Sequence, residues 1–202
     1  MLPYIYPFKL KIILINMRKP LTFFELQLMQ REHDSRNHTD IYTLPLFDKM
    51  NHYVLHYAKY AARLTPKKPD SETLKELKRT YIDAFLITLA ASNALNIDLD
   101  IEMRKAFKRI PKNVNDFPIS TNKMSSDDLR RYSKDVLIIS NGAMADTMEK
   151  RDHLDDKDSR GILIKSLLEI MEMILRGSYS LGFDIVQASL DRRKMIADLK
   201  IT

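Results

Sequence analysis

Residues 80–91 read TYIDAFLITLAA, and a helix over this stretch would be apolar on every side for about three turns. A helix without a polar face is buried all round. Asp83 is the one carboxylate within the stretch, and an ionised carboxylate in such a place is costly unless another group pairs with it. The partner of Asp83 therefore determines which chemistry this part of the chain can support.

The composition favours helices and excludes several kinds of site. The 202-residue chain has only 4 glycines and 8 prolines, and its 45% hydrophobic and 30% charged residues are ordinary for a soluble globular protein. It has no cysteine, which excludes disulfides, thiol catalysis and thiolate metal ligands. The net charge of +6 allows an anionic partner, although an ordinary basic surface is the better explanation.

Capping residues and apolar periodicity predict an all-α protein. Thr22 and Glu25 form a capping box that starts the first helix, and Ser71 and Asp98 are candidate caps of the third and fourth. Pro111 ends the fourth helix, and Ser125 with Asp128 begins the next. The expected helices cover residues 22–33, 47–64, 71–95, 98–111, 125–153, 159–179 and 185–199, with a polar connection at 34–45 and a charged turn at 155–158.

The chain divides into a leader at residues 1–20, a helical unit at 21–111, a linker at 112–124 and a second helical unit at 125–202. The apolar run within the leader is too short to span a bilayer and lacks the features of a secretory signal. We therefore expect a cytoplasmic protein that does not enter a membrane.

The two units share an order of elements. LNID at residues 95–98 is mirrored by LGFD at 181–184, which places Asp98 and Asp184 86 residues apart. The same offset sets Glu169 opposite Asp83 and Ser178 opposite Ser92. Matched turns and element order indicate two tandem, diverged copies of one helical unit.

Residues 83–99, DAFLITLAASNALNIDL, resemble the all-α nucleoside-triphosphate pyrophosphohydrolases, the MazG and dCTP-pyrophosphatase group. The resemblance lies in the aspartate, the apolar helix and a "(V/I)-D-L" turn. LTFFELQ at residues 21–27 and the connection at 34–40 are similar to that family's first helix and loop. The resemblance implies a helical bundle completed by pairing, either in a homodimer or inside a duplicated chain as a pseudo-dimer.

Members of that family hold Mg²⁺ with E-x-x-E on the second helix and E-x-x-D on the third, and the ion helps water attack the triphosphate. Each copy here retains one carboxylate of the four, so the resemblance implies a degraded Mg²⁺ site, no catalytic residues and no resident metal or cofactor. The positions that correspond to the family site are His56, Lys59, Thr80 and Asp83 in the first copy, and Ser140, Ala143, Ser166 and Glu169 in the second.

Three further hypotheses concern individual side chains. Lys59 can take the place of the metal and pair with Asp83, the alternative being that Asp83 faces a wet crevice and Lys59 faces solvent. His52 and His56 have the i, i+4 spacing of a two-histidine metal site with Asp83 as the candidate third ligand, although histidines at this spacing are usually exposed or capping groups. Family members contact phosphate through residues of the fourth helix, and the resemblance places Glu102 and Ala106 at two of these positions. The candidate phosphate-binding residues are therefore Lys105, Lys108 and Arg109.

The leading hypothesis is a catalytically impaired relative that binds a nucleotide or serves as a regulatory or structural module. One alternative is an active, Mg²⁺-dependent pyrophosphohydrolase. Its acids would come from elsewhere in the chain, for instance Glu72, Glu76, Asp146, Glu149 or Glu172. A second alternative is a basic helical module that binds nucleic acid or an acidic protein. Its basic clusters would be Arg104, Lys105, Lys108, Arg109 and Lys112, and Arg192, Arg193 and Lys194. Nucleic acid is the less expected partner, because no recognised motif or aromatic stacking set accompanies these clusters.

Overall fold

The computed structural model describes residues 20–65, 69–107, 114–116, 123–152 and 158–199, and the regular structure of these residues is helical throughout, which confirms the all-α prediction. The leader, the end of the predicted fourth helix and most of the linker and charged turn lie outside these ranges. The helices are α2 (Phe23–Asn37), α3 (Thr39–Tyr42), α4 (Leu46–Arg63), α5 (Asp70–Ala94), α6 (Leu99–Phe107), the 3₁₀ helix η1 (Val114–Asp116), α7 (Ser126–Asp152), α8 (Ser159–Leu181) and α9 (Ile185–Leu199).

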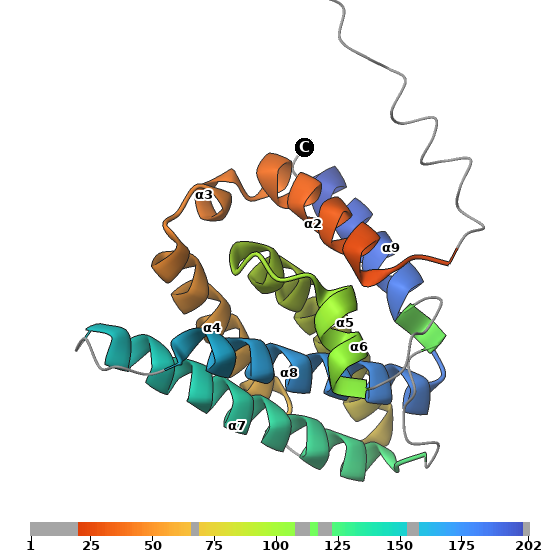
Figure 1. Ribbon diagram of the computed structural model, residues 1–202. Coiled ribbons are helices and arrows are strands. Elements are labelled where there is room, and N and C mark those ends of the chain that lie inside the picture. Colours follow the sequence, from red (N-terminus) through yellow and green to blue (C-terminus); the bar gives the residue numbers. More distant parts are fainter. Residues whose placement is uncertain (1–19, 66–68, 108–113, 117–122, 153–157, 200–202) are drawn as a thin grey trace, which may run out of the picture.

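Four long helices form the centre of the fold. The α4–α5 pair packs on the α7–α8 pair, with α7 against α4 and α5 against α8. The helices α2 and α9 lie side by side and both contact α5 (Figure 1). No single described helix is long and apolar enough to cross a membrane; α5 and α6 together meet the length and composition of a span, but they are bent by 108°.

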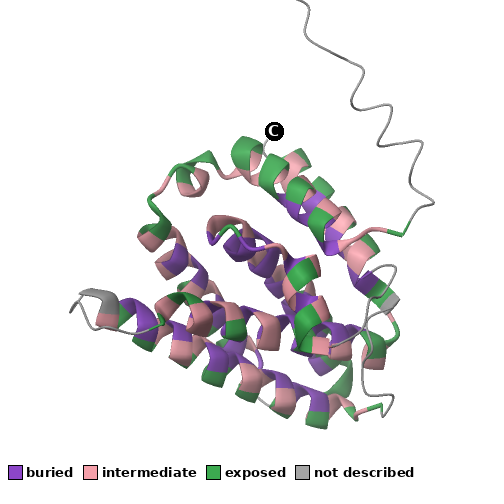
Figure 2. Cartoon of the chain, in the orientation of Figure 1, coloured by how far each residue is buried: buried purple, intermediate pink, exposed green. Residues whose placement is uncertain are grey.

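The core explains why α5 is so apolar. Tyr81, Phe85 and Leu89 are fully buried, and the buried surface of the neighbouring helices faces the same interior (Figure 2). The hydroxyl group of buried Tyr81 has a partner, as buried polar atoms require: Tyr81 Oη lies 2.6 Å from Ser133 Oγ on α7. The expectation of burial on every side is wrong along one edge, because Asp83 and Ile87 are only partly buried and line a cavity.

The capping predictions are largely confirmed. Thr22 and Glu25 form the capping box of α2, Asp98 Oδ1 accepts from the backbone N–H of Ile101 at 3.1 Å, and Ser125 Oγ accepts from the N–H of Asp128 at 3.2 Å. The prediction for Ser71 is wrong. Pro69 is the N-cap of α5, because the fixed φ of proline suits a helix start and its missing N–H costs nothing there.

Residues 34–45, predicted as a polar connection, are partly helical. The helix α2 continues to Asn37, and α3 follows after His38. Contacts between side chains four residues apart support the extra turn of α2: Gln30 Nε2 donates to Asp34 Oδ1 at 2.8 Å. The extension matters because it places the end of α2 and α3 against the cavity.

The turns after α5 and α8 have the same main-chain geometry. Asn96 (φ 52°) and Gly182 (φ 66°) adopt the left-handed conformation, which suits Gly and Asn. The hydrogen bonds around them match at an offset of 86 residues. They are Ile97 N to Ser92 O and Phe183 N to Ser178 O, then Ile101 N to Asp98 Oδ1 and Gln187 N to Asp184 Oδ1.

Candidate functional site

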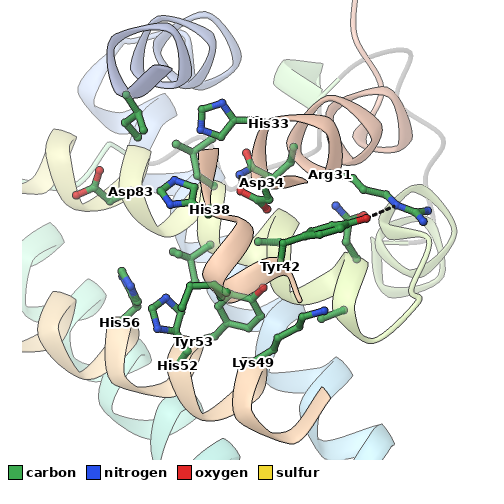
Figure 3. Close-up of a pocket in the computed structure, with 18 of the residues that line it drawn as sticks. Arg31, His33, Asp34, His38, Tyr42, Lys49, His52, Tyr53, His56 and Asp83 are labelled. Atoms are coloured by element: carbon green, nitrogen blue, oxygen red, sulfur yellow. Dashed lines mark hydrogen bonds between the residues drawn. The ribbon is translucent and has the colours of Figure 1, made fainter. Parts of the chain in front are cut away.

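A cavity of about 810 Å³ opens between α2, α3, α4, α5 and α9. Side chains from these helices point into it (Figure 3). The volume lies within the roughly 300–1,000 Å³ of small-molecule sites. The cavity contains the first predicted family site, since Asp83, His56 and Lys59 line it together.

Asp83 is held by two arginines. Arg63 Nη1 on α4 donates to Asp83 Oδ2 at 2.8 Å, and Arg192 Nε on α9 donates to Asp83 Oδ1 at 3.2 Å. The carboxylate side chain is only 11% exposed, while the arginines are 18% and 31% exposed. Both carboxylate oxygens therefore have a guanidinium partner, which compensates the buried charge.

The prediction that Lys59 pairs with Asp83 is wrong. Lys59 Nζ lies 3.3 Å from His56 Nδ1 and 5.5 Å from the centre of the Tyr60 ring. Burial and the neighbouring Arg63 both lower the pKa of Lys59. The cation that pairs with Asp83 from α4 is instead the guanidinium of Arg63, one helical turn beyond Lys59. The helix was predicted correctly, and the residue was not.

The residues present do not fit Mg²⁺. This ion needs several oxygen ligands in octahedral geometry, and two guanidinium groups occupy the positions beside Asp83 where a cation would bind. Thr80, the other third-helix position, is fully buried and does not line the cavity. The geometry supports no step through a magnesium ion at this site.

His52 and His56 both line the cavity from α4, with ring centres 4.5 Å apart. Burial and then the charge of Lys59 lower the pKa of His56 to about 4, so this ring is neutral at pH 7. His56 Nδ1 lies 3.1 Å from Tyr60 Oη. Among the described residues, the side chains close enough to share a metal ion are His33, Asp34 and His38 instead.

The cavity wall has an excess of positive charge. Its basic side chains outnumber its acidic ones by six to three, with the histidines counted as neutral. Three tyrosines also contribute to the wall, and Arg31 Nε contacts Tyr42 Oη at 3.4 Å. The basic side chains are Arg31, Lys49, Lys59, Arg63, Arg79 and Arg192, and the acidic ones are Asp34, Asp40 and Asp83.

The second predicted site lies beside a smaller cavity. Glu169 lines a cavity of about 430 Å³ between α6 and α8, and Ser140 Oγ donates to Glu169 Oε2 at 2.9 Å. Ser166 is buried and, like the half-buried Ala143, does not line this cavity. The structure therefore brings together Ser140 and Glu169 but not the other two members of the predicted set.

Other predicted residues lie away from the larger cavity. Lys105 pairs with Glu102 at 2.8 Å on the surface, while Lys108 and Arg109 lie outside the described residues. Glu72, Glu76, Asp146 and Glu149 do not line either cavity, and Glu172 lines the smaller one. The basic cluster on the last helix is not a surface patch, because Arg192 binds Asp83 and Arg193 is 5% exposed.

Sequence reasoning missed Arg63 and Arg192 as partners of Asp83. It also missed the group at the end of α2, which consists of His33, Asp34 and His38. Arg63 follows Lys59 by four residues, so a signal for it existed, but Arg192 lies 109 residues from Asp83. Comparison of the chain with protein-family models, curated proteins and solved structures found no match.

Proposed function

We propose that this chain is a non-catalytic relative of the all-α nucleotide pyrophosphohydrolases that binds a phosphate-bearing ligand, a nucleotide, in the cavity around Asp83. The observation that carries the proposal is the pair of arginines on Asp83. In the family pattern this carboxylate helps to hold a metal that neutralises the triphosphate. Here guanidinium groups stand in that place, and guanidinium itself binds phosphate well.

The remainder of the cavity supports an anionic ligand. Lys59 and Arg79 are exposed side chains on its wall, and neither is needed to hold Asp83. Tyr42 adds an aromatic side chain that is half-buried. Such a combination of cations and an aromatic ring, in a cavity of this size, suits a nucleoside phosphate.

Matched turns in the two halves support the duplication that the proposal assumes. The turns after α5 and α8 each have a left-handed residue at the same place, and two pairs of hydrogen bonds match at one offset. At the same offset Arg192 corresponds to Ala106, and each lines the cavity of the opposite half. The packing of α4–α5 on α7–α8 is the arrangement expected of a pseudo-dimer that pairs its two copies within one chain.

Binding is tested by calorimetric titration of the chain with ATP, dCTP and pyrophosphate in EDTA. We expect saturable binding in the absence of divalent ions. Lys59→Ala should weaken it, because the ammonium lies on the wall without pairing to Asp83. Lys194→Ala is the matched control, since this exposed lysine on the same helix as Arg192 does not line the cavity and should bind as the unmodified chain does.

The active-enzyme alternative is separated in the same samples. Pyrophosphate release is measured with each nucleotide and Mg²⁺, and we expect none above the background of buffer alone. Mg²⁺-dependent release that is lost in Asp83→Asn would refute the proposal. Equal loss of binding in Lys59→Ala and Lys194→Ala would show that the cavity is not the site.

A further inference from the structure

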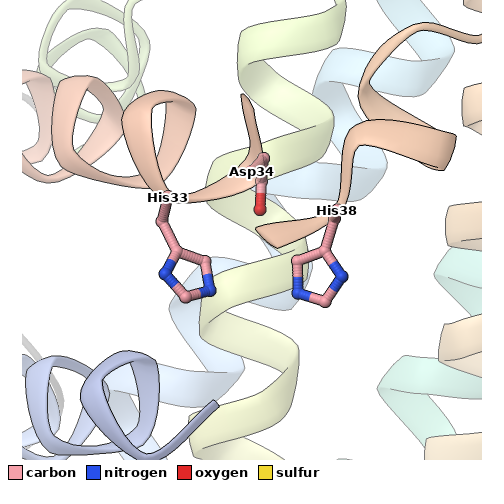
Figure 4. A group of neighbouring side chains, drawn as sticks. All are labelled: His33, Asp34 and His38. Carbon is pink, nitrogen blue, oxygen red and sulfur yellow. The ribbon is translucent and has the colours of Figure 1, made fainter. Parts of the chain in front are cut away.

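His33, Asp34 and His38 meet where α2 ends. His33 and Asp34 belong to the last turns of the helix and His38 is its C-cap residue, with φ −135° and ψ 46°. The chain turns at His38, which brings its ring back beside the two others. One ligand atom of each residue lies within 4.8 Å of the others, and the two rings flank the carboxylate (Figure 4).

We propose that these three side chains bind a divalent transition-metal ion of the Zn²⁺ or Co²⁺ class. Two imidazoles and one carboxylate are a ligand set that such ions prefer, whereas Mg²⁺ prefers oxygen alone. Ligands about 2.0–2.1 Å from a tetrahedral ion lie about 3.3 Å apart. The separation of 4.8 Å or less therefore closes by small side-chain rotations, which the half-buried positions of all three residues permit.

Outer contacts already orient two of the ligands. The side-chain amide of Asn37 lies 3.2 Å from His33 Nδ1, so we assign Nε2 as the nitrogen that would bind the ion. With Nε2 bound, Nδ1 would carry the proton, and the Asn37 amide would exchange its hydrogen bond to His33 O, 3.1 Å in this structure, for one that its oxygen accepts from Nδ1. Gln30 Nε2 donates to Asp34 Oδ1 at 2.8 Å, which fixes the carboxylate. Contacts of this kind set the orientation and affinity of metal ligands.

The other histidine pair on the same cavity provides a comparison. His52 and His56 are close to each other, but they form no metal-binding group with a carboxylate among the described residues. Two histidine pairs thus line one cavity, and the geometry favours His33 and His38 as metal ligands. The i, i+4 spacing of His52 and His56 had pointed to the other pair.

The inference goes beyond the proposed nucleotide binding and does not rest on it. Three protein ligands leave at least one coordination position for water or an anion, and His33, Asp34 and His38 all line the larger cavity. The ion would also hold the end of α2 to the start of α3. Nucleotide titrations in EDTA and metal titrations without nucleotide keep the two proposals separate.

The test uses the untagged full chain, stripped with EDTA and dialysed. Co²⁺ is titrated with visible absorption as the readout, and Zn²⁺ is titrated by calorimetry. We expect one ion per chain. Asp34→Asn and the double variant His33→Ala/His38→Ala should weaken binding at least 100-fold, and Asn37→Ala should weaken it about 10–100-fold.

The double variant His52→Ala/His56→Ala is the matched control and should retain the affinity of the unmodified chain within about twofold. Circular dichroism checks that each variant is folded, and the single substitution His38→Gln carries the test if His33→Ala/His38→Ala unfolds. Absence of saturable binding to the unmodified chain would overturn the proposal. Equal loss in the two histidine double variants, or full affinity in folded His38→Gln, would overturn it as well.

Discussion

Replacing Asp83 by asparagine tests whether the carboxylate is a neutralising partner of the arginines. Breaking a well-buried ion pair costs about 3–5 kcal/mol. Asparagine still accepts one hydrogen bond, and Arg63 and Arg192 keep 18% and 31% exposure to solvent. We therefore expect Asp83→Asn to lower the free energy of unfolding by about 2–3 kcal/mol, or Tm by about 4–12 °C for a chain of this size.

The same substitution should strengthen anion binding. Asp83 places a negative charge behind the two guanidinium groups that face the cavity. At roughly 8 Å from a ligand phosphate and an effective dielectric of about 20, that charge opposes binding by about 2 kcal/mol. Its removal should tighten pyrophosphate or ATP binding by about 30-fold, because 1.4 kcal/mol is a factor of ten.

The assay is thermal unfolding with and without ligand, together with calorimetric titration in EDTA. In Asp83→Asn the Tm without ligand should fall, while the ligand-induced rise in Tm should exceed that of the unmodified chain. Asp135→Asn is the control, since this exposed aspartate pairs loosely with Lys134 at 3.6 Å and should change neither quantity. Lower stability combined with weaker anion binding would refute the reasoning, since it would mean that Asp83 helps to bind the ligand.

Three further substitutions follow from the described contacts. The pKa of His56 is lowered to about 4 from an ordinary 6.5, so the fold favours the neutral ring, and the stability that this ring contributes is lost as pH falls from about 6.5 towards 4. The free energy of unfolding in urea should therefore drop between pH 7 and pH 5, and His56→Gln should reduce that drop by about 1 kcal/mol, after allowance for partial exposure. An equal drop in the variant and the unmodified chain would contradict this. A Cβ on Gly177 would overlap the ring of Tyr81, so Gly177→Ala should cost about 1–3 kcal/mol. Gly142 has nothing within 4 Å of such a Cβ, so Gly142→Ala should stabilise α7 by about 0.5–1 kcal/mol in the same measurement. Gly182 has φ 66°, and Gly182→Ala should cost about 1–2 kcal/mol; an unchanged midpoint would show that the turn relaxes.

Much of the helical order was predictable because its signals are local. The capping box at Thr22 and Glu25 and the serine cap at Ser125 are read from residues three apart, and the structure has both. The failure at Ser71 is also local. Two start signals, Pro69 and Ser71, stood within three residues, and the rigid proline is the residue found at the helix start.

The partners of Asp83 could not be predicted in the same way. Lys59 and Arg63 are four residues apart on one helix face, so periodicity cannot tell which of them meets a carboxylate on α5. Arg192 reaches Asp83 only because α9 returns to pack on α5. The group His33, Asp34 and His38 depends on the turn at His38, which lies in the stretch that the sequence predicted only as a polar connection.

The pairing of Asp83 with Arg192 makes the larger cavity depend on both halves of the chain. Asp83 and Arg63 belong to the first predicted helical unit and Arg192 to the second, and two hydrogen bonds join them. In the smaller cavity, Ala106 lies at the position that corresponds to Arg192, and its side chain carries no charge to pair with Glu169. Ser140 donates a hydrogen bond to the Glu169 carboxylate. Two halves that share a turn geometry therefore differ in charge, and of the two cavities described only the larger has an excess of basic side chains. An anion should accordingly bind the chain at one site only, and a titration that shows two equivalent sites would contradict this division between the halves.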